Sequence, residues 1–258
     1  MATRHLAACL VNVCQIKIES FFIGLHLMEH VLDNPAWNAL NSGNRQLSYG
    51  NNHIKYFDKE VSPIIGFKET SVANFRELHG LITHNNALLF VTPVEMEIPG
   101  PWKVVHFIKG IQMVCDTRQV QDELTTGIEL ISLTNAHIPQ MLALTKLTNP
   151  GPFATNTIAF GHYHGIFEGD KLVAMAGQRL HVYNYAEVSA VCTHPDHTGR
   201  GYARLLLLQQ LNRIKAAAEI PFLHVRYDNE RAIGVYESLG FSTRTSAYFY
   251  VLHKKELQ

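Results

Sequence analysis

The sequence predicts a mixed α/β protein in which helices flank a central sheet. Short apolar runs alternate with amphipathic helical patterns along the chain, most regularly after residue 127. Of the 258 residues, 47% are apolar and 17% are charged, a balance that buries a sizeable core and excludes global disorder. At about 150 residues per domain, this length corresponds to more than one domain and fewer than three.

The charge balance speaks against two classes of partner. Lysine and arginine together number 22, as do aspartate and glutamate, so the formal net charge is zero. Binding to nucleic acid or to a membrane surface through bulk charge needs a basic excess, so we expect neither partner. No apolar run reaches the roughly 18 residues that span a bilayer. Four cysteines without Cys-x-x-Cys spacing favour a reducing cytoplasm; they are Cys9, Cys14, Cys115 and Cys192.

The first 27 residues differ from an ordinary domain opening. Arg4 and His5 precede a short apolar run, as at the start of a signal peptide, but polar residues interrupt the run and no convincing cleavage site follows. We interpret residues 1–27 as an extension outside the fold, with Met28 as the natural start. A helical pattern over residues 28–32 is expected to stop before Pro35.

Residues 28–120 are predicted to form a first, smaller lobe. An amphipathic helix over residues 72–82 follows from the apolar positions that share one side of it. The expected strands lie at residues 54–57, 64–67, 87–91 and 104–114. This half contains no catalytic motif, and the polar residues 116–127 read as a linker.

Residues 121–258 are predicted to form the second lobe, in the order β-α-β-β-β-α-β-α-β. Thr134 and Asn135 cap the expected first helix, which runs to about Lys146. The second helix is expected over residues 201–219 and the third over residues 230–239. The expected strands are residues 128–133, 166–168, 172–180, 186–193, 222–226 and 241–252.

One segment of the second lobe suggests an anion site. The apolar strand 186–193 runs through a short loop into Gly199-Arg200-Gly201 and then into a helix. Glycines let the backbone approach a ligand closely, and a helix N-terminus offers free N–H groups to a phosphate. The alternative is a plain turn before a helix.

A second motif affects how the glycine-containing segment is interpreted. Residues 229–241 read Asn-Glu-Arg-Ala-Ile-Gly-Val-Tyr-Glu-Ser-Leu-Gly-Phe. Together the two segments resemble the GCN5-related N-acetyltransferase (GNAT) superfamily, in particular its GPF/FR47-like branch, over about residues 128–252. The resemblance implies the GNAT fold: a mixed, mostly antiparallel sheet flanked by helices. One departure is Thr198, where the family usually has arginine or glutamine.

The resemblance also implies acetyl-CoA as the acyl donor. Backbone N–H groups around Gly201 would hold the pyrophosphate, and the N–H of Val191 would polarise the thioester carbonyl. The implied cofactor-binding residues are Val191, Thr193, Thr198, Gly199, Arg200, Gly201, Tyr202, Ala203 and Asn229. For Asn229 the alternative is an N-terminal cap of the following helix.

Two residues are candidates for catalysis. Glu187 matches a general-base position in the histone-acetyltransferase branch, and such a base would deprotonate the acceptor amine. The alternative is an ion-paired or solvated strand glutamate. Tyr236 matches the family tyrosine that protonates the departing thiolate, and its alternative is a core tyrosine on an amphipathic helix.

Histidine pairs raise the question of a metal site. His162 and His164, like His194 and His197, have short spacings, but neither pair has a cysteine or carboxylate at a recognised ligand spacing. We therefore expect no metal. The first lobe, from its element order alone, resembles a degenerate copy of the GNAT fold, as in two-lobed members whose first lobe completes the acceptor site.

The sequence thus predicts a cytoplasmic N-acyltransferase that uses acyl-CoA by direct attack in a ternary complex. The expected acceptor is a primary amine on a small molecule or an amino acid. The alternative is a non-catalytic acyl-CoA-binding or regulatory module, which the departure at Thr198 favours and the presence of both Glu187 and Tyr236 disfavours. The sequence leaves open the acyl length and whether the chain is a monomer or a homodimer.

Overall fold

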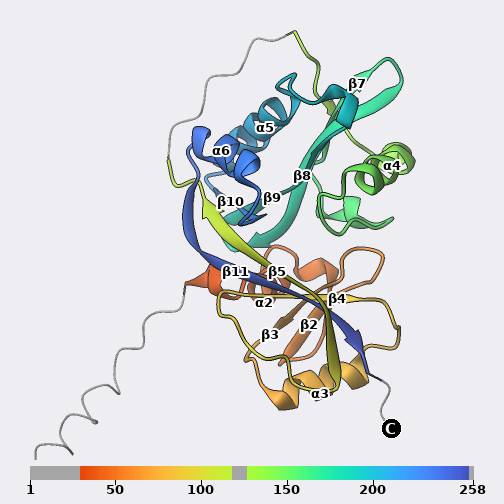
Figure 1. Cartoon of the computed structure of the whole chain (residues 1–258), viewed down its shortest axis with the longest axis vertical. Coiled ribbons are helices and arrows are strands. Elements are labelled where there is room, and N and C mark those ends of the chain that lie inside the picture. The colour runs from red at the N-terminus through yellow and green to blue at the C-terminus, as the bar shows by residue number, and fades with distance from the viewer. Residues whose placement is uncertain (1–29, 118–126, 256–258) are drawn as a thin grey trace, which may run out of the picture. The chain divides into compact units, whose positions relative to one another are not determined.

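The computed structural model describes residues 30–117 and 127–255 (Figure 1). The described residues from Val31 onward form one compact unit. The predicted N-terminal extension lies outside the described residues, and so do residues 118–126, where the predicted boundary between the two lobes falls. Within the described ranges, no helix is long and apolar enough to cross a membrane.

The first half of the unit begins with short helical turns and continues into strands. The helical elements are η1 (Val31–Asp33), α2 (Pro35–Asn41), η2 (Arg45–Leu47) and α3 (Val72–Leu81). The strands are β1 (Ser48–Gly50), β2 (Ile54–Phe57), β3 (Ile64–Phe67), β4 (Leu88–Thr92) and β5 (Trp102–Val114). The predicted helix over residues 72–82 and the four predicted strands are therefore confirmed to within two residues at each end.

Pro35 starts a helix that the sequence analysis did not anticipate. Residues Val31–Asp33 form only a 3₁₀ turn, and α2 begins at Pro35 itself. Proline suits the first turn of a helix because its missing N–H would have no partner there and its φ is already helical. Ala36, Ala39 and Leu40 then bury one side of α2.

The second half supplies the remaining strands and helices. Its helical elements are η3 (Asn135–His137), α4 (Ile138–Thr148), η4 (Thr157–Phe160), η5 (Pro195–His197), α5 (Tyr202–Ala216) and α6 (Glu230–Ser238). Its strands are β6 (Ile131–Ser132), β7 (His164–Glu168), β8 (Lys171–Val182), β9 (Tyr185–Thr193), β10 (Ile220–Arg226) and β11 (Ser242–Lys254). The strand predicted over residues 128–133 is shorter than expected: β6 covers only Ile131–Ser132, and Ile128 and Leu130 pack against a small core cluster.

The described strands form one mixed sheet in the order β1-β2-β3-β4-β11-β5-β10-β9-β8-β7-β6. The pairs β3–β4 and β9–β10 are parallel, and the other pairs are antiparallel. β5 and β11 pair along their whole lengths and run through both halves (Figure 1). A strand from the first half thus lies between β10 and β11 of the second. The predicted mixed, mostly antiparallel sheet with flanking helices is confirmed.

Helices cover both faces of the second half of the sheet. Met141 and Leu144 of α4 pack with Met175 of β8. Leu205 and Leu206 of α5 pack with the neighbouring Ala174 and Ala176. Because successive side chains of a strand point to opposite faces, α4 and α5 lie on opposite sides of β8.

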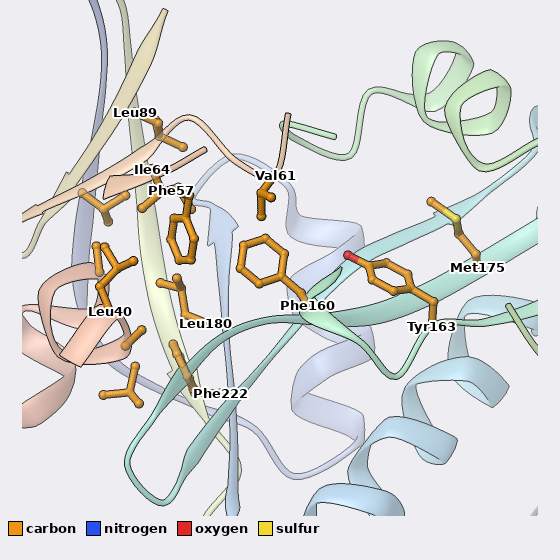
Figure 2. Close-up of a cluster of buried hydrophobic side chains, with 14 of the residues drawn as sticks. Leu40, Phe57, Val61, Ile64, Leu89, Phe160, Tyr163, Met175, Leu180 and Phe222 are labelled. Carbon is orange, nitrogen blue, oxygen red and sulfur yellow. The ribbon is translucent and has the colours of Figure 1, made fainter. Parts of the chain in front are cut away.

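The largest core cluster joins the two halves (Figure 2). Phe57 of β2 and Phe160 of η4 meet edge to face, with ring centroids 5.1 Å apart. Around them the cluster combines side chains from both halves, including Leu40, Val61, Ile64, Leu89, Tyr163, Leu180 and Phe222. The hydroxyl of Thr157 also donates to the carbonyl of Val61 at 2.7 Å. The second half is therefore not packed independently of the first.

Candidate functional site

The sheet opens between β9 and β10. These parallel strands pair only where residues 185–187 face residues 220–222. β10 continues to Arg226 and stays paired on its other side with β5. β9 continues to Thr193 and stays paired with β8. Past Glu187, the facing edges of β9 and β10 are not paired with each other in the described chain, and we call this unpaired stretch the gap.

Backbone donors of β9 face this gap. The N–H of His194 donates to the carbonyl of Val173 at 2.7 Å, on the β8 side. Because backbone groups alternate along a strand, the N–H of Cys192 points to the same side, and those of Val191 and Thr193 point to the other. Two backbone donors thus face the open side of β9. The Thr193 hydroxyl is buried and has no hydrogen-bond partner within the described residues.

A bulge in β9 lies next to these donors. The register with β8 shifts between the pairs Met175–Cys192 and Gly177–Ser189, so β9 has an extra residue here. Ala190 takes a positive φ of 54°, which is rare for any residue but glycine. A bulge re-aims the strand and interrupts its pairing, and such strained positions gather at functional sites. Here it turns the backbone of β9 at the mouth of the gap.

The Gly199–Gly201 loop lies at the start of α5 and forms an open cradle. Both glycines have φ near 80°, and a Cβ added to either would meet nothing within 4 Å. Gly201 is the N-cap of α5, and no side chain caps that end. The first N–H groups of α5, at Tyr202 and Ala203, therefore have no intrahelical partner and are free to bind an anion.

Side chains of the cradle turn toward the β7–β8 hairpin. Glu168 accepts hydrogen bonds from Arg200, from the Tyr202 hydroxyl at 2.7 Å, and from His197 Nδ1 at 3.1 Å. The hydrogen bond from Tyr202 is the main cause of the lowered pKa of Glu168. These contacts leave the backbone of the loop as its ligand-facing part.

Thr198 behaves differently from the rest of the loop. Its backbone N–H donates to the carbonyl of Pro195 at 3.3 Å, and its hydroxyl donates to the same oxygen at 3.0 Å. Both donors of Thr198 are thus used in closing the η5 turn. The cradle proper begins at Gly199.

Tyr236 and Asn229 lie at α6. Tyr236 packs in the same core cluster as Val191 of β9, and its ring meets Phe241 edge to face at 5.9 Å. Burial raises the pKa of Tyr236 to about 12, so it stays protonated at neutral pH. Its hydroxyl has no hydrogen-bond partner within the described chain. The side chain of Asn229 accepts from the N–H of Ala232 at 3.2 Å, which is the N-cap role.

Glu187 is the centre of a buried polar cluster. Its side chain is fully buried, and Arg179 of β8 binds it in a two-pronged ion pair at 2.6 and 2.9 Å. His224 Nδ1 of β10 lies 2.7 Å from Oε1, and the N–H of Leu180 lies 3.2 Å from Oε2. Burial raises the pKa of Glu187, but the charge of Arg179 and the hydrogen bonds outweigh it and hold the pKa well below its usual range.

This environment argues against the predicted role of Glu187 as the general base. Four donors occupy its two oxygens, so no position remains for a proton from an amine. A strongly lowered pKa also makes the carboxylate a poor proton acceptor at neutral pH. The ion-paired alternative describes its geometry.

The cluster continues as a chain of hydrogen bonds across five adjacent strands. Gln112 of β5 lies 3.0 Å from His224 Nε2 and receives a 2.5 Å hydrogen bond from Arg244 of β11. Arg244 in turn binds Asp33 at 2.5 Å. The Gln112 oxygen accepts from Arg244, so its amide nitrogen is the donor to His224. In this arrangement His224 Nε2 accepts from the Gln112 amide, and Nδ1 faces the Glu187 carboxylate as the donor.

Sequence reasoning did not identify Arg179, Gln112 or His224. Each is a polar residue inside an apolar strand, and a buried polar group needs a partner. That signal was present at Glu187 too, between Ala186 and Val188. It could not name the partners, because only the order of strands brings them together.

The histidine pairs make ordinary hydrogen bonds. His164 contacts Ser132 and Gln210, and His194 contacts Lys171. Within the described residues, no group of three or more His, Cys, Asp or Glu is placed to hold a metal ion.

Comparisons with known proteins point to one family. Residues 163–250 match the family model described as FR47-like protein. The crystal structure of a protein assigned to the GNAT family of acetyltransferases, from Novosphingobium aromaticivorans, has a TM-score of 0.80 and 30% identity. The alignment covers 88% of this chain and 100% of that one.

Two further relatives match a shorter stretch of the chain or match it at lower identity. The N-alpha-acetyltransferase RimI of Mycobacterium tuberculosis is 36% identical over 84 residues, which are 31% of this chain. The match spans about half (51%) of the length of that curated relative. A GCN5-related N-acetyltransferase from Kribbella flavida has a TM-score of 0.54 over 84% of this chain and 95% of that one, and at 15% identity it shows the fold alone.

Proposed function

The chain belongs to the GNAT family of acetyltransferases, and from this premise we propose that it transfers the acetyl group of acetyl-CoA to a primary amine. The proposed acceptor is a small molecule or an amino acid. The observation that carries the proposal is the unpaired edge of β9 beside the Gly199–Gly201 cradle. Strand alternation from the hydrogen bond of the His194 N–H turns the N–H groups of Val191 and Thr193 toward this edge.

The residues at this gap fit a CoA thioester. The open glycine cradle and the uncapped start of α5 offer N–H groups to a pyrophosphate, from Gly199, Arg200, Gly201, Tyr202 and Ala203. The free edge of β9 offers a place for an extended amide-containing arm to add as a strand does. Thr198 is left out of the donor set because both of its donors are used locally. Asn229 acts by shaping the start of α6 through its cap.

When bound, acetyl-CoA supplies an activated acyl carbon. The N–H of Val191 stabilises negative charge on the thioester oxygen while the amine nitrogen attacks. A nitrogen–carbon bond forms and the carbon–sulfur bond breaks. The hydroxyl of Tyr236 donates to the departing sulfur, and water returns a proton to Tyr236 as the amine loses one. Holding donor and acceptor together in a ternary complex supplies much of the rate.

Glu187 supports this site without exchanging protons. Its ion pair with Arg179 and its hydrogen bond with His224 tie β8, β9 and β10 together below the gap, where β9 and β10 are last paired. The amine then loses its proton to solvent. The cytoplasm remains the proposed location, since the described cysteines Cys115 and Cys192 are free thiols.

Thiol release tests the proposal against its rival, a module that binds acyl-CoA without turnover. The full chain is incubated with acetyl-CoA and a panel of primary amines, and free CoA thiol is measured. We expect release that depends on both an amine and the chain, and mass spectrometry detects the acetylated amine. Tight acetyl-CoA binding with no release for any amine would instead support the binding module.

A further inference from the structure

Arg179 offers one edge of its guanidinium to the space beside the β9 bulge. Nε and Nη2 are both donated to Glu187. Nη1 has no hydrogen-bond partner among the described residues. It is also absent from their fully buried polar atoms that lack a partner, so it remains accessible. The side chain keeps 15% of its surface exposed. A buried cation thus presents two free N–H groups to a ligand.

Arg179 lines a small cavity. Ser189 and Ala190 of the bulge and the segment 150–153 after α4 line the same cavity. The other polar side chains of the lining are already used: Tyr163 donates to the carbonyl of Gln178, and Thr157 to that of Val61. The volume is ≈ 10 Å³, about what one water-sized group needs.

The position of Arg179 is fixed before any ligand arrives. Its partner Glu187 is held by His224, which is held by Gln112 and, through it, by Arg244. Such preorganised donors bind without the cost of ordering a flexible side chain. The free edge of the Arg179 guanidinium is therefore preorganised to bind a ligand.

The charge of Arg179 selects the kind of oxygen. Glu187 already neutralises it inside the protein, so a second carboxylate would bring an uncompensated charge into a buried site. A carbonyl oxygen accepts the same hydrogen bonds without that cost. A small cavity also suits one oxygen better than a bulky group.

We propose that Arg179, with the Ser189 hydroxyl, binds the carbonyl oxygen next to the acceptor's amine, so that the preferred acceptor is an α-aminoacyl group: an amino-acid amide or the first residue of a peptide. This inference rests on the proposed function, because it places the amine beside Ala190 and Val191. It narrows the acceptor from primary amines in general to those with a carbonyl on the neighbouring carbon.

Matched acceptors test the inference on the wild-type chain. L-alaninamide is compared with 3-methylbutan-2-amine, which has the same shape but an isopropyl group instead of the carboxamide. Rates are compared per unprotonated amine, since the amide lowers the amine pKa. We expect kcat/KM to favour alaninamide by about 10- to 100-fold, the value of one hydrogen bond to a charged group. L-alanine tests an acceptor with a carboxylate in place of the carboxamide, and a peptide that begins with alanine tests a polypeptide acceptor.

Two variants test whether Arg179 and Ser189 cause the preference for alaninamide. Arg179→Lys keeps a cation for Glu187 but loses the free edge, and Ser189→Ala removes only a hydroxyl. Both are expected to reduce the preference for alaninamide, Arg179→Lys to below about threefold, while acetyl-CoA affinity stays unchanged. If Arg179→Lys does not fold, Ser189→Ala and the wild-type acceptor series still decide.

The outcomes separate the inference from the function. Equal rates for alaninamide and the hydrocarbon amine, with clear turnover, would overturn the inference and leave the acetyltransferase proposal intact. A preference for free alanine over alaninamide would also overturn it, since a carboxylate would then be the recognised group. No turnover with any acceptor would count against the function itself.

Discussion

The imidazole of His224 donates through Nδ1 to Glu187, with 2.7 Å between His224 Nδ1 and Glu187 Oε1, and both side chains are shielded from solvent. The contact joins β9 and β10 at the last point where the two strands pair. Beyond it, the strands separate and the proposed thioester site opens. The pair thus sits where the sheet divides, and it holds the two strands at the apex of the gap.

Replacing Glu187 with glutamine is expected to reduce stability more than chemistry. The change leaves the Arg179 charge buried without its partner, and breaking such a pair costs about 3–5 kcal/mol. Because the folded pKa is depressed, this stabilisation is complete above the ordinary value of 4.5 and disappears as pH falls through the folded pKa. Denaturant unfolding of both forms at neutral and acidic pH should therefore show a difference that shrinks in acid.

Glu95→Gln is the matched control for this prediction. Glu95 pairs with Lys109 at 3.0 Å, but both side chains are about half exposed, so the change should have an effect of less than about 1 kcal/mol. An opposite pattern would restore the general-base role for Glu187: unchanged stability in Glu187→Gln together with an activity loss that is greatest at low pH.

Features that depend on nearby residues could be predicted from the sequence, whereas contacts that depend on the order of strands in the sheet could not. The Gly199–Gly201 loop and the Asn229 cap were predictable because each depends on neighbours a few residues away. The series of hydrogen bonds that links Arg179 to Arg244 involves residues of five strands. In sequence, Gln112 lies more than a hundred positions from Arg244 and from His224. Their contact depends on β5 lying between β10 and β11, and long-range strand order leaves no mark in local periodicity.

The choice between the two interpretations of Glu187, general base or ion-paired residue, has the same origin. The apolar run over residues 186–193 correctly placed Glu187 on a strand, but the choice between base and ion pair depended on Arg179 and His224. The missed start of α2 is a local error instead: proline was read as a stop, although the first turn of a helix favours it.

Gly201→Glu is expected to weaken CoA binding without unfolding the chain. The new side chain enters open space, so nothing in the core is disturbed, but its charge occupies the place proposed for the pyrophosphate. Calorimetry should show at least a tenfold loss of CoA affinity. Gly169→Glu is the control, because Gly169 also has a positive φ and open surroundings but lies in the β7–β8 turn. Equal affinities for both variants would remove the cradle from the proposal.

The shared core predicts that the two halves unfold together. Phe57 and Phe160 are each at most 5% exposed and come from different halves. Phe160→Ala should cost about 3–5 kcal/mol, and a double-mutant cycle with Phe57→Ala should give a coupling of about 0.5–1.5 kcal/mol. Tyr49→Ala, at a 55% exposed ring, should have little effect. Two separate unfolding transitions in the wild-type chain would contradict the shared core.

Tyr236→Phe separates the chemistry of the site from its architecture. The substitution keeps the ring that packs beside Phe241 and near Val191, and it removes only the hydroxyl. A positioned proton donor contributes about 10²–10⁴ in rate, so kcat should fall by that factor while acetyl-CoA affinity stays nearly unchanged. Since burial raises the pKa of Tyr236 to about 12, the donor is protonated throughout the neutral range. The rate should then rise with pH only as the acceptor amine loses its proton, with the same pH dependence in both forms. Tyr227→Phe, at a 61% exposed ring, is the control and should keep the wild-type rate. A Tyr236→Phe variant with wild-type kcat would leave catalysis to the β9 backbone and to positioning alone.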